Sequence, residues 1–227
     1  MQYDSSKKIA IDKPFDFKED ANWRVFRIMS EFVEGFEFLY PLRKEVTFFG
    51  SARLPEHDKW YLEAEKLGRM LAQGGFTVIT GGGPGIMEAG NKGAYEGGGE
   101  SIGLNIELPE EQRRNAYVKK GIGFHYFFTR KVMLTASAQA YVFFPGGFGT
   151  ADEFFEMITL IQTGKMESVP ALLMGKDFWG PMDSWIKNTM VEKYKTLDAH
   201  ETTLYTMVDS AAEAYEILKD SKERKYF

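Results

Sequence analysis

The hydrophobic residues near the N-terminus follow a helical period. An amphipathic helix is predicted over about residues 20–40, because apolar side chains recur at spacings of three and four residues: Phe26, Met29, Val33, Phe36 and Tyr40. A stripe of this kind needs a surface to cover. We expect it to be buried in the core or at a contact between subunits.

After this helix, short apolar segments alternate with helical patterns. The predicted strands cover residues 45–50, 76–80, 101–108, 123–128, 140–144, 170–175 and 204–208. The predicted helices cover about residues 60–73, 85–96, 130–138, 150–163, 177–195 and 210–220. This alternation is typical of a parallel sheet with helices on both faces. The expected fold class is therefore α/β, a doubly wound sheet with the N-terminal helix as an extra element.

The length of 227 residues suits one domain of this kind with a sizeable core. We expect a polar arm over residues 1–19, a single domain over 20–220, and a frayed, charged tail over 221–227. Aromatic residues make up 15% of the chain, which argues against a disordered protein. The arm has no apolar core of signal-peptide length, and no later window is apolar enough to span a membrane. The sequence therefore predicts a cytoplasmic protein without a membrane partner.

Charge and residue usage exclude several classes of partner. The net charge of -5 gives no field that would attract a nucleic-acid backbone, so no nucleic-acid partner is expected. The chain has no cysteine, which excludes disulfides, thiol nucleophiles and thiolate-bound metals. Its three histidines, His57, His125 and His200, are far apart and form no metal-binding motif. We predict no metal site.

Glycines concentrate where the second predicted strand meets its helix. Twelve of the 23 glycines lie between Gly74 and Gly103. Those at the ends of predicted helices are typical C-caps. The triplet 81–83 instead follows a strand and precedes a helix, so the amides around Gly82 and Gly83 could converge on an anion at the helix N-terminus.

A second glycine junction follows the predicted strand 140–144 and has the sequence PGGFGTADE, residues 145–153. Open α/β sheets bind ligands at the carboxyl ends of their strands, so we expect one pocket between the two junctions. Neither junction is a Walker A motif, and neither matches GxGxxG. Kinase-like and ordinary NAD-binding interpretations are weakened accordingly.

Two interpretations of Glu153 remain open on spacing alone. Thr150 and Glu153 have the spacing of a capping box, in which the threonine caps the helix and the glutamate reaches back to the cap's amide. Asp152 and Glu153 would also complement the helix dipole. A carboxylate one step past a glycine loop is equally able to act on a group that the loop holds. Its position at the ligand end of the sheet favours catalysis.

Arg130 and Lys131 follow Thr129 at the predicted start of a helix, where the positive end of the dipole disfavours cations. Exposure to solvent would explain both side chains. A nearby anion would also explain them, either a phosphate or the Glu153 carboxylate. A pair between Arg130 and Glu153 would keep the carboxylate ionised, as suits a base or an electrostatic stabiliser.

Three further residues are weaker candidates for the same site. Ser51 follows the first strand and could contribute a hydroxyl group, although a role in a turn is equally compatible. Met87 and Met133 stand near two helix starts, where they could line a flat pocket for a base. Core packing is the more usual role for such methionines.

These motifs resemble the Lonely Guy (LOG) family of nucleotide phosphoribohydrolases, some of whose members carry a lysine decarboxylase label. The resemblance covers most of residues 45–210. It rests on GGGPGIMEAGNKGA at 81–94, on Arg130 and Lys131, and on residues 145–153, which match the family pattern PGGxGTxxE at every fixed position. The resemblance implies a Rossmann-like fold in a homodimer or larger homo-oligomer. The implied reaction is hydrolysis of a nucleoside 5′-monophosphate to free base and ribose 5-phosphate.

Carried over to this chain, the resemblance makes Glu153 and Arg130 the catalytic pair. It implies that Gly146, Gly147, Gly149 and Thr150 hold the 5′-phosphate. The other substrate-binding residues that we expect are Phe148, Lys131, Gly82, Gly83, Ser51 and Met133.

The chain departs from the plant cytokinin-activating members, which have a His-Glu pair where Phe127, Phe128 and Thr129 precede Arg130. With its extra N-terminal helix, it looks like the longer bacterial-type branch of the family. The expected substrate is therefore AMP, with an N6-modified AMP such as a cytokinin nucleotide as the other candidate. A pyridoxal phosphate enzyme needs a lysine Schiff base, which no residue here requires, so no cofactor is expected.

Two rival functions remain. A carrier would bind a nucleotide or phosphorylated cofactor in the same loops without cleaving it, and only the pair of Arg130 and Glu153 argues against this alternative. A dinucleotide oxidoreductase should have an acidic residue at the end of the second strand, where this chain has three glycines. That function ranks last.

Overall fold

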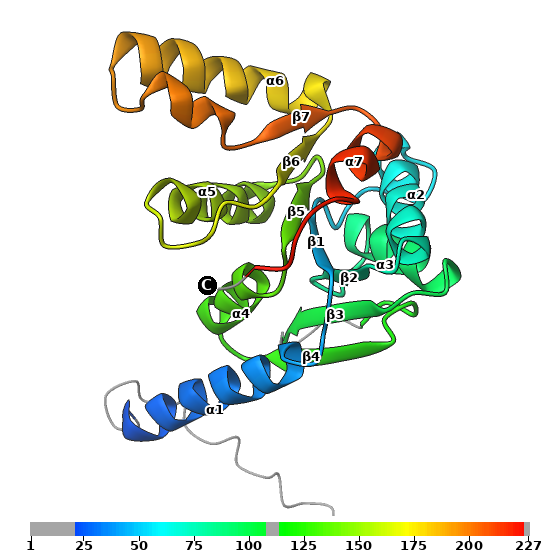
Figure 1. Ribbon diagram of the computed structural model, residues 1–227. Helices are drawn as coiled ribbons and strands as arrows, with labels where there is room; N and C mark the ends of the chain where they lie inside the picture. Colours follow the sequence, from blue (N-terminus) through cyan, green and yellow to red (C-terminus); the bar gives the residue numbers. More distant parts are fainter. Residues whose placement is uncertain (1–20, 108–113, 225–227) are drawn as a thin grey trace, which may run out of the picture.

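A seven-stranded sheet forms the centre of the protein, in a computed structural model that describes residues 21–107 and 114–224. All neighbouring strands are parallel, in the order β4-β3-β2-β1-β5-β6-β7 (Figure 1). The strands are β1 (Glu45–Phe49), β2 (Thr77–Thr80), β3 (Ser101–Ile106), β4 (Lys120–Phe124), β5 (Ala140–Phe143), β6 (Ala171–Met174) and β7 (Thr206–Val208). The chain builds outward from β1 to β4 and then returns to the other side of β1 with β5. This reversal places a ligand crevice beside β1.

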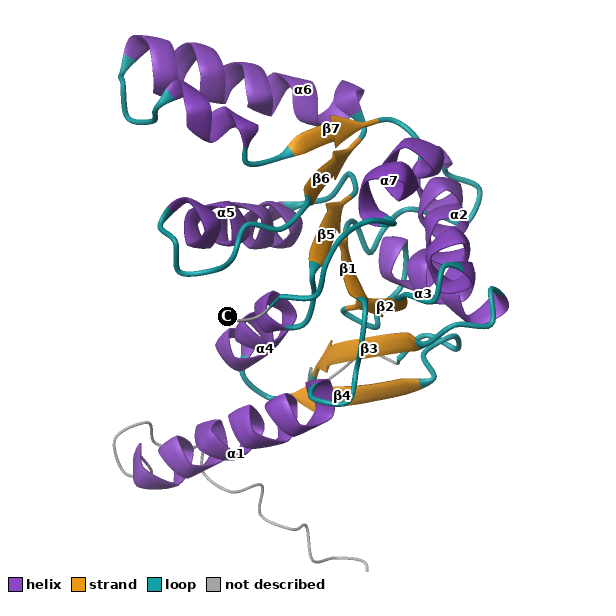
Figure 2. Cartoon of the chain, viewed as in Figure 1, coloured by secondary structure: helices purple, strands orange, loops and turns teal. Residues whose placement is uncertain are grey.

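Helices cover both faces of the sheet, as Figure 2 shows. They are α1 (Ala21–Leu39), α2 (Lys59–Gln73), α3 (Ile86–Glu96), α4 (Phe127–Ala136), α5 (Phe148–Gln162), α6 (Lys176–Trp185) and α7 (Ala211–Leu218). One core contains buried residues of α2, α3 and α7, and the opposite core contains buried residues of α4, α5 and α6. The predicted Rossmann-like, doubly wound α/β fold with an added N-terminal helix is confirmed.

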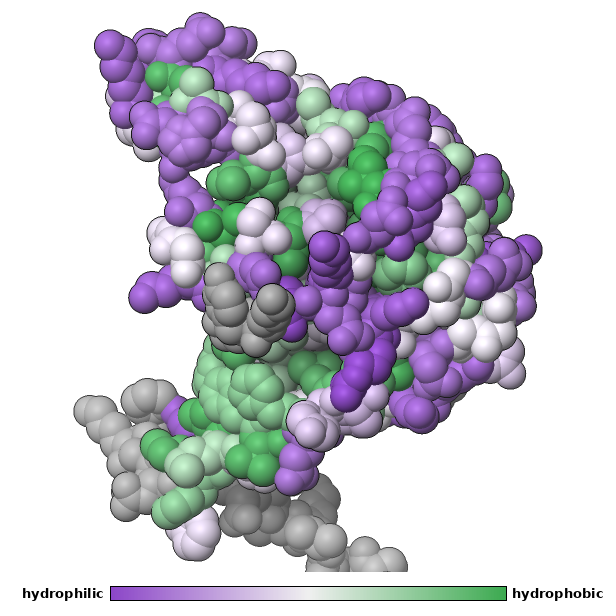
Figure 3. Space-filling model, viewed as in Figure 1, coloured by the Kyte–Doolittle hydropathy of each residue, from purple (hydrophilic) through white to green (hydrophobic). Residues whose placement is uncertain are grey.

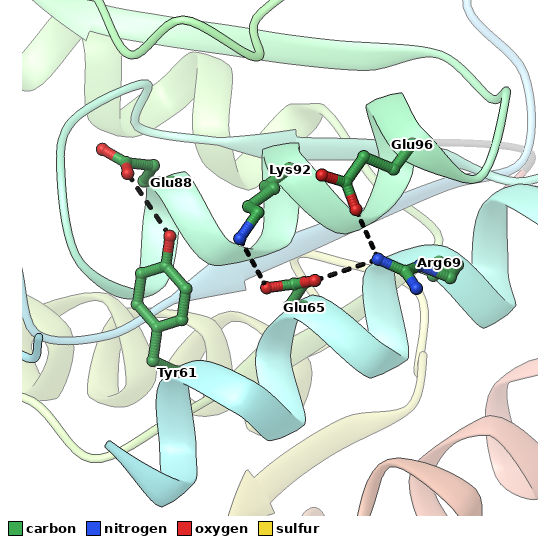
Figure 4. A network of polar contacts seen from close by, with 6 residues as sticks. All are labelled: Tyr61, Glu65, Arg69, Glu88, Lys92 and Glu96. Atoms are coloured by element: carbon green, nitrogen blue, oxygen red, sulfur yellow. Dashed lines mark hydrogen bonds and ion pairs between the residues drawn. The ribbon is translucent and has the colours of Figure 1, made fainter. Parts of the chain in front are cut away.

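The helix after the first glycine junction is fastened to its neighbour by polar contacts (Figure 4). Glu65 of α2 accepts from Arg69 at 2.9 Å and from Lys92 of α3 at 3.1 Å. The remaining contacts join the same two helices: Arg69 with Glu96, and the Tyr61 hydroxyl with Glu88. These contacts tie α3 to α2 on the outer side, while its N-terminus faces the crevice.

Helix α1 contacts α4 and β4. Its buried side faces the core with Glu31, Gly35 and the half-buried Phe38. The expectation that the stripe on this helix is covered is not met within the chain, because its five side chains are 49–82% exposed: Phe26, Met29, Val33, Phe36 and Tyr40. Hydrophobic residues accordingly gather on this end of the molecule in Figure 3.

The segment from β4 to α4 differs from the prediction. A strand was expected over 123–128 and a helix from 130, but β4 ends at Phe124 and α4 begins at Phe127. The backbone amides of His125 and Tyr126 donate to the Glu31 carboxylate of α1 instead of continuing the sheet. A contact with a distant segment therefore ends the strand early.

Two other boundaries also differ. The helix predicted over 177–195 divides into α6 and a π-helical segment, Ile186–Lys193. The end of the chain was expected to be frayed, yet Ser221 accepts hydrogen bonds from Gln139, and Arg224 donates to the carbonyl oxygens of Thr135 and Ala136. The tail up to residue 224 therefore packs against α4 and β5. The predicted polar arm lies outside the described residues.

Candidate active site

A cleft of about 1050 Å³ opens at the carboxyl ends of the central strands. Its wall includes the residues after β1, the first residue after β2, and the junction between β5 and α5. Because β2 and β5 both pair with β1, the two glycine junctions flank the same strand end. The single pocket predicted between them is present. It brings together most of the expected site residues: Ser51, Gly81, Met87, Arg130, Lys131, Gly146, Gly147, Phe148, Gly149, Thr150 and Glu153.

The N-terminus of α5 forms one end of the cleft. The first amides of a helix have no intrahelical acceptor. Gly147, the N-cap residue of α5, has no side chain that could accept from them. The Thr150 side chain folds against Gly146, where a Cβ would come within 2.1 Å of the Thr150 Oγ1. Phe148, the first helical residue, is 96% exposed. An anion placed here would meet backbone N–H groups and the positive end of the helix dipole.

The first glycine junction contributes less backbone to the cleft than expected. Of the triplet, Gly81 lines the cleft, whereas Gly82 and Gly83 do not. The Gly82 amide donates to the Thr80 hydroxyl at 2.9 Å, and the Gly83 carbonyl accepts from the Asn115 amide group at 3.0 Å. The structure therefore places Gly82 and Gly83 behind the lining of the cleft, in a turn held by internal hydrogen bonds, and substrate binding by these two residues stays a prediction.

Arg130 occupies the space that Gly81 leaves open. Its Nε donates to the Leu104 carbonyl oxygen at 2.7 Å, and a Cβ on Gly81 would come within 2.2 Å of its Nη2. Burial lowers the pKa of Arg130, an effect that the nearby Glu153 carboxylate opposes. Among the described residues, no direct ion pair joins Arg130 to Glu153. The guanidinium is thus held by the sheet rather than by its expected carboxylate partner.

Glu153 is a buried carboxyl group in the wall of the cleft, with 7% of its surface exposed. Burial raises its pKa from the ordinary 4.5 to about 7; Lys131 and Arg130 lower the pKa, whereas Glu156 and Asp152 raise it. Its Oε2 has no hydrogen-bond partner among the described residues. An unpartnered buried oxygen in a cleft is typical of a functional site.

The capping-box interpretation that spacing left open for Thr150 and Glu153 does not fit the structure. Helix α5 begins at Phe148 with Gly147 as its N-cap, so Thr150 already lies within the first turn. Its amide donates to the Gly147 carbonyl oxygen at 3.1 Å. Glu153 is accordingly in the second turn, where it has no cap to reach, and the capping explanation for this residue falls away.

Lys131 lies beside the cleft with two carboxylate partners. Its Nζ is 2.8 Å from Asp152 Oδ2 and 2.9 Å from Glu156 Oε2. Burial lowers the pKa of Lys131, but hydrogen bonds to these carboxylates raise it above its ordinary value overall. The anion expected near this lysine is therefore provided, at least in part, by α5 itself.

The weaker candidates separate into two groups. The Ser51 side chain accepts from the Arg53 amide at 3.1 Å and also lines the cleft, so it combines the two roles considered for it. Met87 lines the cleft as well. Met133 does not, because it is fully buried in the core and packs where a Cβ on Gly35 of α1 would stand. The structure therefore places Met133 in the core rather than among the residues that line the cleft.

The sequence did not indicate the wall that α6 contributes. Phe178, Trp179, Pro181 and Met182 line the cleft, and the Trp179 indole donates to the Phe143 carbonyl oxygen at 3.1 Å. These residues carry no motif, and only their position after β6, beside the switch in strand order, could have suggested a role. They add an apolar wall to the cleft.

Within residues 21–107 and 114–224, no helix is long and apolar enough to cross a membrane. In the same ranges, no group of three or more His, Asp or Glu side chains is arranged to hold a metal ion.

The chain belongs to the LOG family: the family model described as possible lysine decarboxylase matches residues 87–218. It is 29% identical over 161 residues to a cytokinin riboside 5′-monophosphate phosphoribohydrolase of Rhodococcoides fascians, a match that covers 69% of this chain and 80% of the relative. It is 26% identical over 190 residues to a pyrimidine/purine nucleotide 5′-monophosphate nucleosidase of Escherichia coli K12, covering 78% of this chain and 40% of that longer protein.

Solved structures share the fold. One is the molybdenum cofactor binding protein of Rippkaea orientalis, which matches with a TM-score of 0.57 and 20% identity over 77% of this chain and 93% of that chain. At this level of identity the likeness concerns the fold alone. The fold therefore occurs both in proteins named as hydrolases and in a protein named for binding a cofactor.

Proposed function

We propose that the protein is an N-glycosidase that hydrolyses a purine nucleoside 5′-monophosphate, AMP or an N6-modified AMP, to free base and ribose 5-phosphate. The observation that carries the proposal is Glu153, a buried carboxyl group with a pKa of about 7 and an unpartnered oxygen in the cleft. It stands one turn from helix amides suited to a phosphate. The names of two relatives, both acting on nucleoside 5′-monophosphates, support the same reaction.

The 5′-phosphate is assigned to the N-terminus of α5. Amides of Phe148 and Gly149 would donate to its oxygens, and the helix dipole would favour its charge. The absence of a side chain at Gly147 and Gly149 supports this assignment, because a Cβ on either would meet open space rather than protein. The ligand can therefore approach the backbone closely at both positions.

The reaction consumes one water. As the bond between C1′ and the base nitrogen breaks, its electrons leave with the base, and the ribose develops positive charge that the ionised Glu153 would stabilise. The water oxygen then bonds to C1′ while the carboxylate takes a proton from it. The proton that Glu153 has taken then passes to the departed base, which regenerates the carboxylate and balances the reaction. The buried, protonated Arg130 would offset the negative charge of the phosphate or of the base during this step.

The decarboxylase label fits these residues poorly. Imine formation with a cofactor aldehyde requires a neutral lysine amine. Lys131, the lysine in the wall of the cleft, is bound by Asp152 and Glu156, which keep its pKa above the ordinary value. A lysine in that state remains protonated at neutral pH, which argues against a Schiff base.

The exposed stripe of α1 supports a homodimer or a larger homo-oligomer. Its five members follow the alternating three and four spacing of a coiled-coil seam. Arg27 lies in the N-terminal half of the helix, and the exposed Glu37 lies in the C-terminal half. Antiparallel pairing with α1 of a second copy would bury both seams and bring opposite charges together. We assign this surface to a second copy of the chain.

The reaction is tested by incubating the full chain with a panel of nucleoside 5′-monophosphates and the matching nucleosides, and following free base by chromatography. The expected result is release of adenine from AMP, in the presence of EDTA, with little release from adenosine. Equal turnover of AMP and adenosine would contradict the phosphate assignment. Binding of AMP without any release of base would show instead that the protein is a carrier.

A further inference from the structure

Helix α1 sends one charged side chain into the interior. Glu31 is 9% exposed, and its carboxylate accepts three hydrogen bonds from the segment between β4 and α4. The donors are the His125 amide at 2.9 Å, the Tyr126 amide at 3.4 Å and the Thr129 hydroxyl at 2.5 Å. A segment near residue 30 therefore holds a turn that lies nearly a hundred residues later in the chain.

This contact replaces a cap that α4 lacks. Tyr126, the N-cap residue of α4, makes no side-chain capping hydrogen bond of its own. A helix N-terminus is stabilised by negative charge and, in a capping box, by a carboxylate that accepts from the amide of the N-cap residue. Glu31 supplies both from another helix, because it accepts from the amide of Tyr126.

The turn that Glu31 holds comes directly before Arg130, the candidate catalytic residue. Arg130 follows Thr129, and its amide donates to the Tyr126 carbonyl oxygen at 3.2 Å, within the turn that Glu31 holds. The far end of the same side chain is fixed by the Leu104 carbonyl oxygen. The guanidinium of Arg130 is thus held by β3, while its backbone lies in the turn that Glu31 of α1 holds.

We propose that Glu31 is a positioning residue, which caps α4 across the fold and so sets the place of Arg130 in the cleft. This inference rests on the proposed function and deepens it, since it gives the added N-terminal helix a role in the reaction. Loss of the carboxylate would let the first turn of α4 shift or fray. A displacement of about 1 Å at a reacting group can cost about a hundredfold in rate.

The test compares Glu31→Ala with Glu34→Ala in the full chain. Glu34 is on the same helix but is exposed, and its carboxylate accepts a hydrogen bond from the Ser30 hydroxyl. With each variant assayed well below its melting temperature, we expect Glu31→Ala to lower kcat/KM for AMP by about tenfold to a hundredfold. Glu34→Ala should stay within about twofold of wild type. Equal activity of the two variants would overturn the proposal.

A double-variant cycle separates positioning from general destabilisation. If Glu31 acts through Arg130, adding Glu31→Ala to Arg130→Ala should cost little further activity. A loss by the same factor in both backgrounds would mean that Glu31 is merely structural. Should Glu31→Ala fail to fold, Thr129→Val, which removes one of the three donors, enters the same cycle with a smaller expected loss.

A conservative variant and a readout without turnover complete the test. In Glu31→Gln, the side-chain oxygen can still accept from the His125 amide and the nitrogen can donate to Thr129, but the Tyr126 amide loses its acceptor, so activity should return in part. Hydrogen exchange at the His125 and Tyr126 amides should be faster in Glu31→Ala than in Glu34→Ala. Unchanged exchange would refute the cap itself, whereas a wild-type chain that never cleaves AMP would refute the proposed function and leave the exchange result intact.

Discussion

The guanidinium of Arg130 lies against the bare Cα of Gly81, so closely that a Cβ at that position would stand 2.2 Å from Nη2 and 2.7 Å from the Met87 sulfur. Glycine at the end of β2 therefore makes room for a side chain that enters from α4. The glycine-rich motif and the arginine, 49 residues apart, form one unit.

Gly81→Ala should displace Arg130 from the cleft. We expect turnover of AMP to fall by about tenfold to a hundredfold while the chain remains folded, because the guanidinium can move but the backbone at residue 81 cannot. Steady-state kinetics with circular dichroism measures both. Gly180→Ala is the matched control, since a Cβ there meets nothing within 4 Å. Equal activity of the two variants would contradict this role for Gly81.

The phosphate assignment can be tested at one backbone amide. Phe148→Pro removes both the ring and the N–H at the first position of α5, where proline is well tolerated. Phe148→Ala removes only the ring. If the amide binds phosphate, the KM for AMP should be about tenfold or more higher in the proline variant than in the alanine variant. Equal KM values would place the phosphate elsewhere.

Much of the fold could be predicted from the sequence because strands and helices alternate with clear periods. The two glycine junctions could also be placed at one edge, since parallel strands end together. The start of α4 could not be predicted, because the glutamate that caps it belongs to α1. Local patterns do not report a partner so distant in sequence.

The functional site, like the fold, could be predicted from the sequence only in part. The segment 145–153, with Glu153 at its end, and Arg130 were found as motifs, and Arg130 and residues 146–153 line the cleft. The capping box was a plausible interpretation of Thr150 and Glu153, but it required the helix to begin at Thr150. Spacing gives no information on which glycine ends the loop, so the earlier start of α5 and the burial of Glu153 became evident only in three dimensions.

The exposed stripe of α1 predicts that the protein forms a homo-oligomer. Val33→Glu should convert the homo-oligomer to smaller species, because it places a charge in the middle of the stripe. Leu62→Glu, at a side chain 53% exposed on α2, is the control and should leave the mass unchanged. Sedimentation equilibrium measures the mass of each variant. A wild-type chain that is monomeric at every concentration would contradict the assignment of this surface to a second copy.

Stability should report the raised pKa of Glu153. Because its pKa is about 7 in the folded chain and 4.5 ordinarily, the folded state binds more protons between these values, and stability falls as pH rises through that range. Glu153→Gln removes this titration. Relative to wild type, the variant should gain stability from pH 4.5 to pH 7, by at most about 3 kcal/mol. Denaturant unfolding at several pH values measures it, and a difference independent of pH would contradict the assigned pKa.

The central claim is that the ionised carboxylate of Glu153 promotes cleavage of the glycosidic bond. The most direct measurement is the turnover of AMP by Glu153→Gln, together with the affinity of the variant for AMP. We predict that AMP binds about as tightly as in wild type, while kcat falls by about a hundredfold or more, the scale seen when a positioned acid, base or charge is removed. Near-normal turnover by Glu153→Gln, in a chain whose wild type releases adenine from AMP, would contradict the account at its central residue.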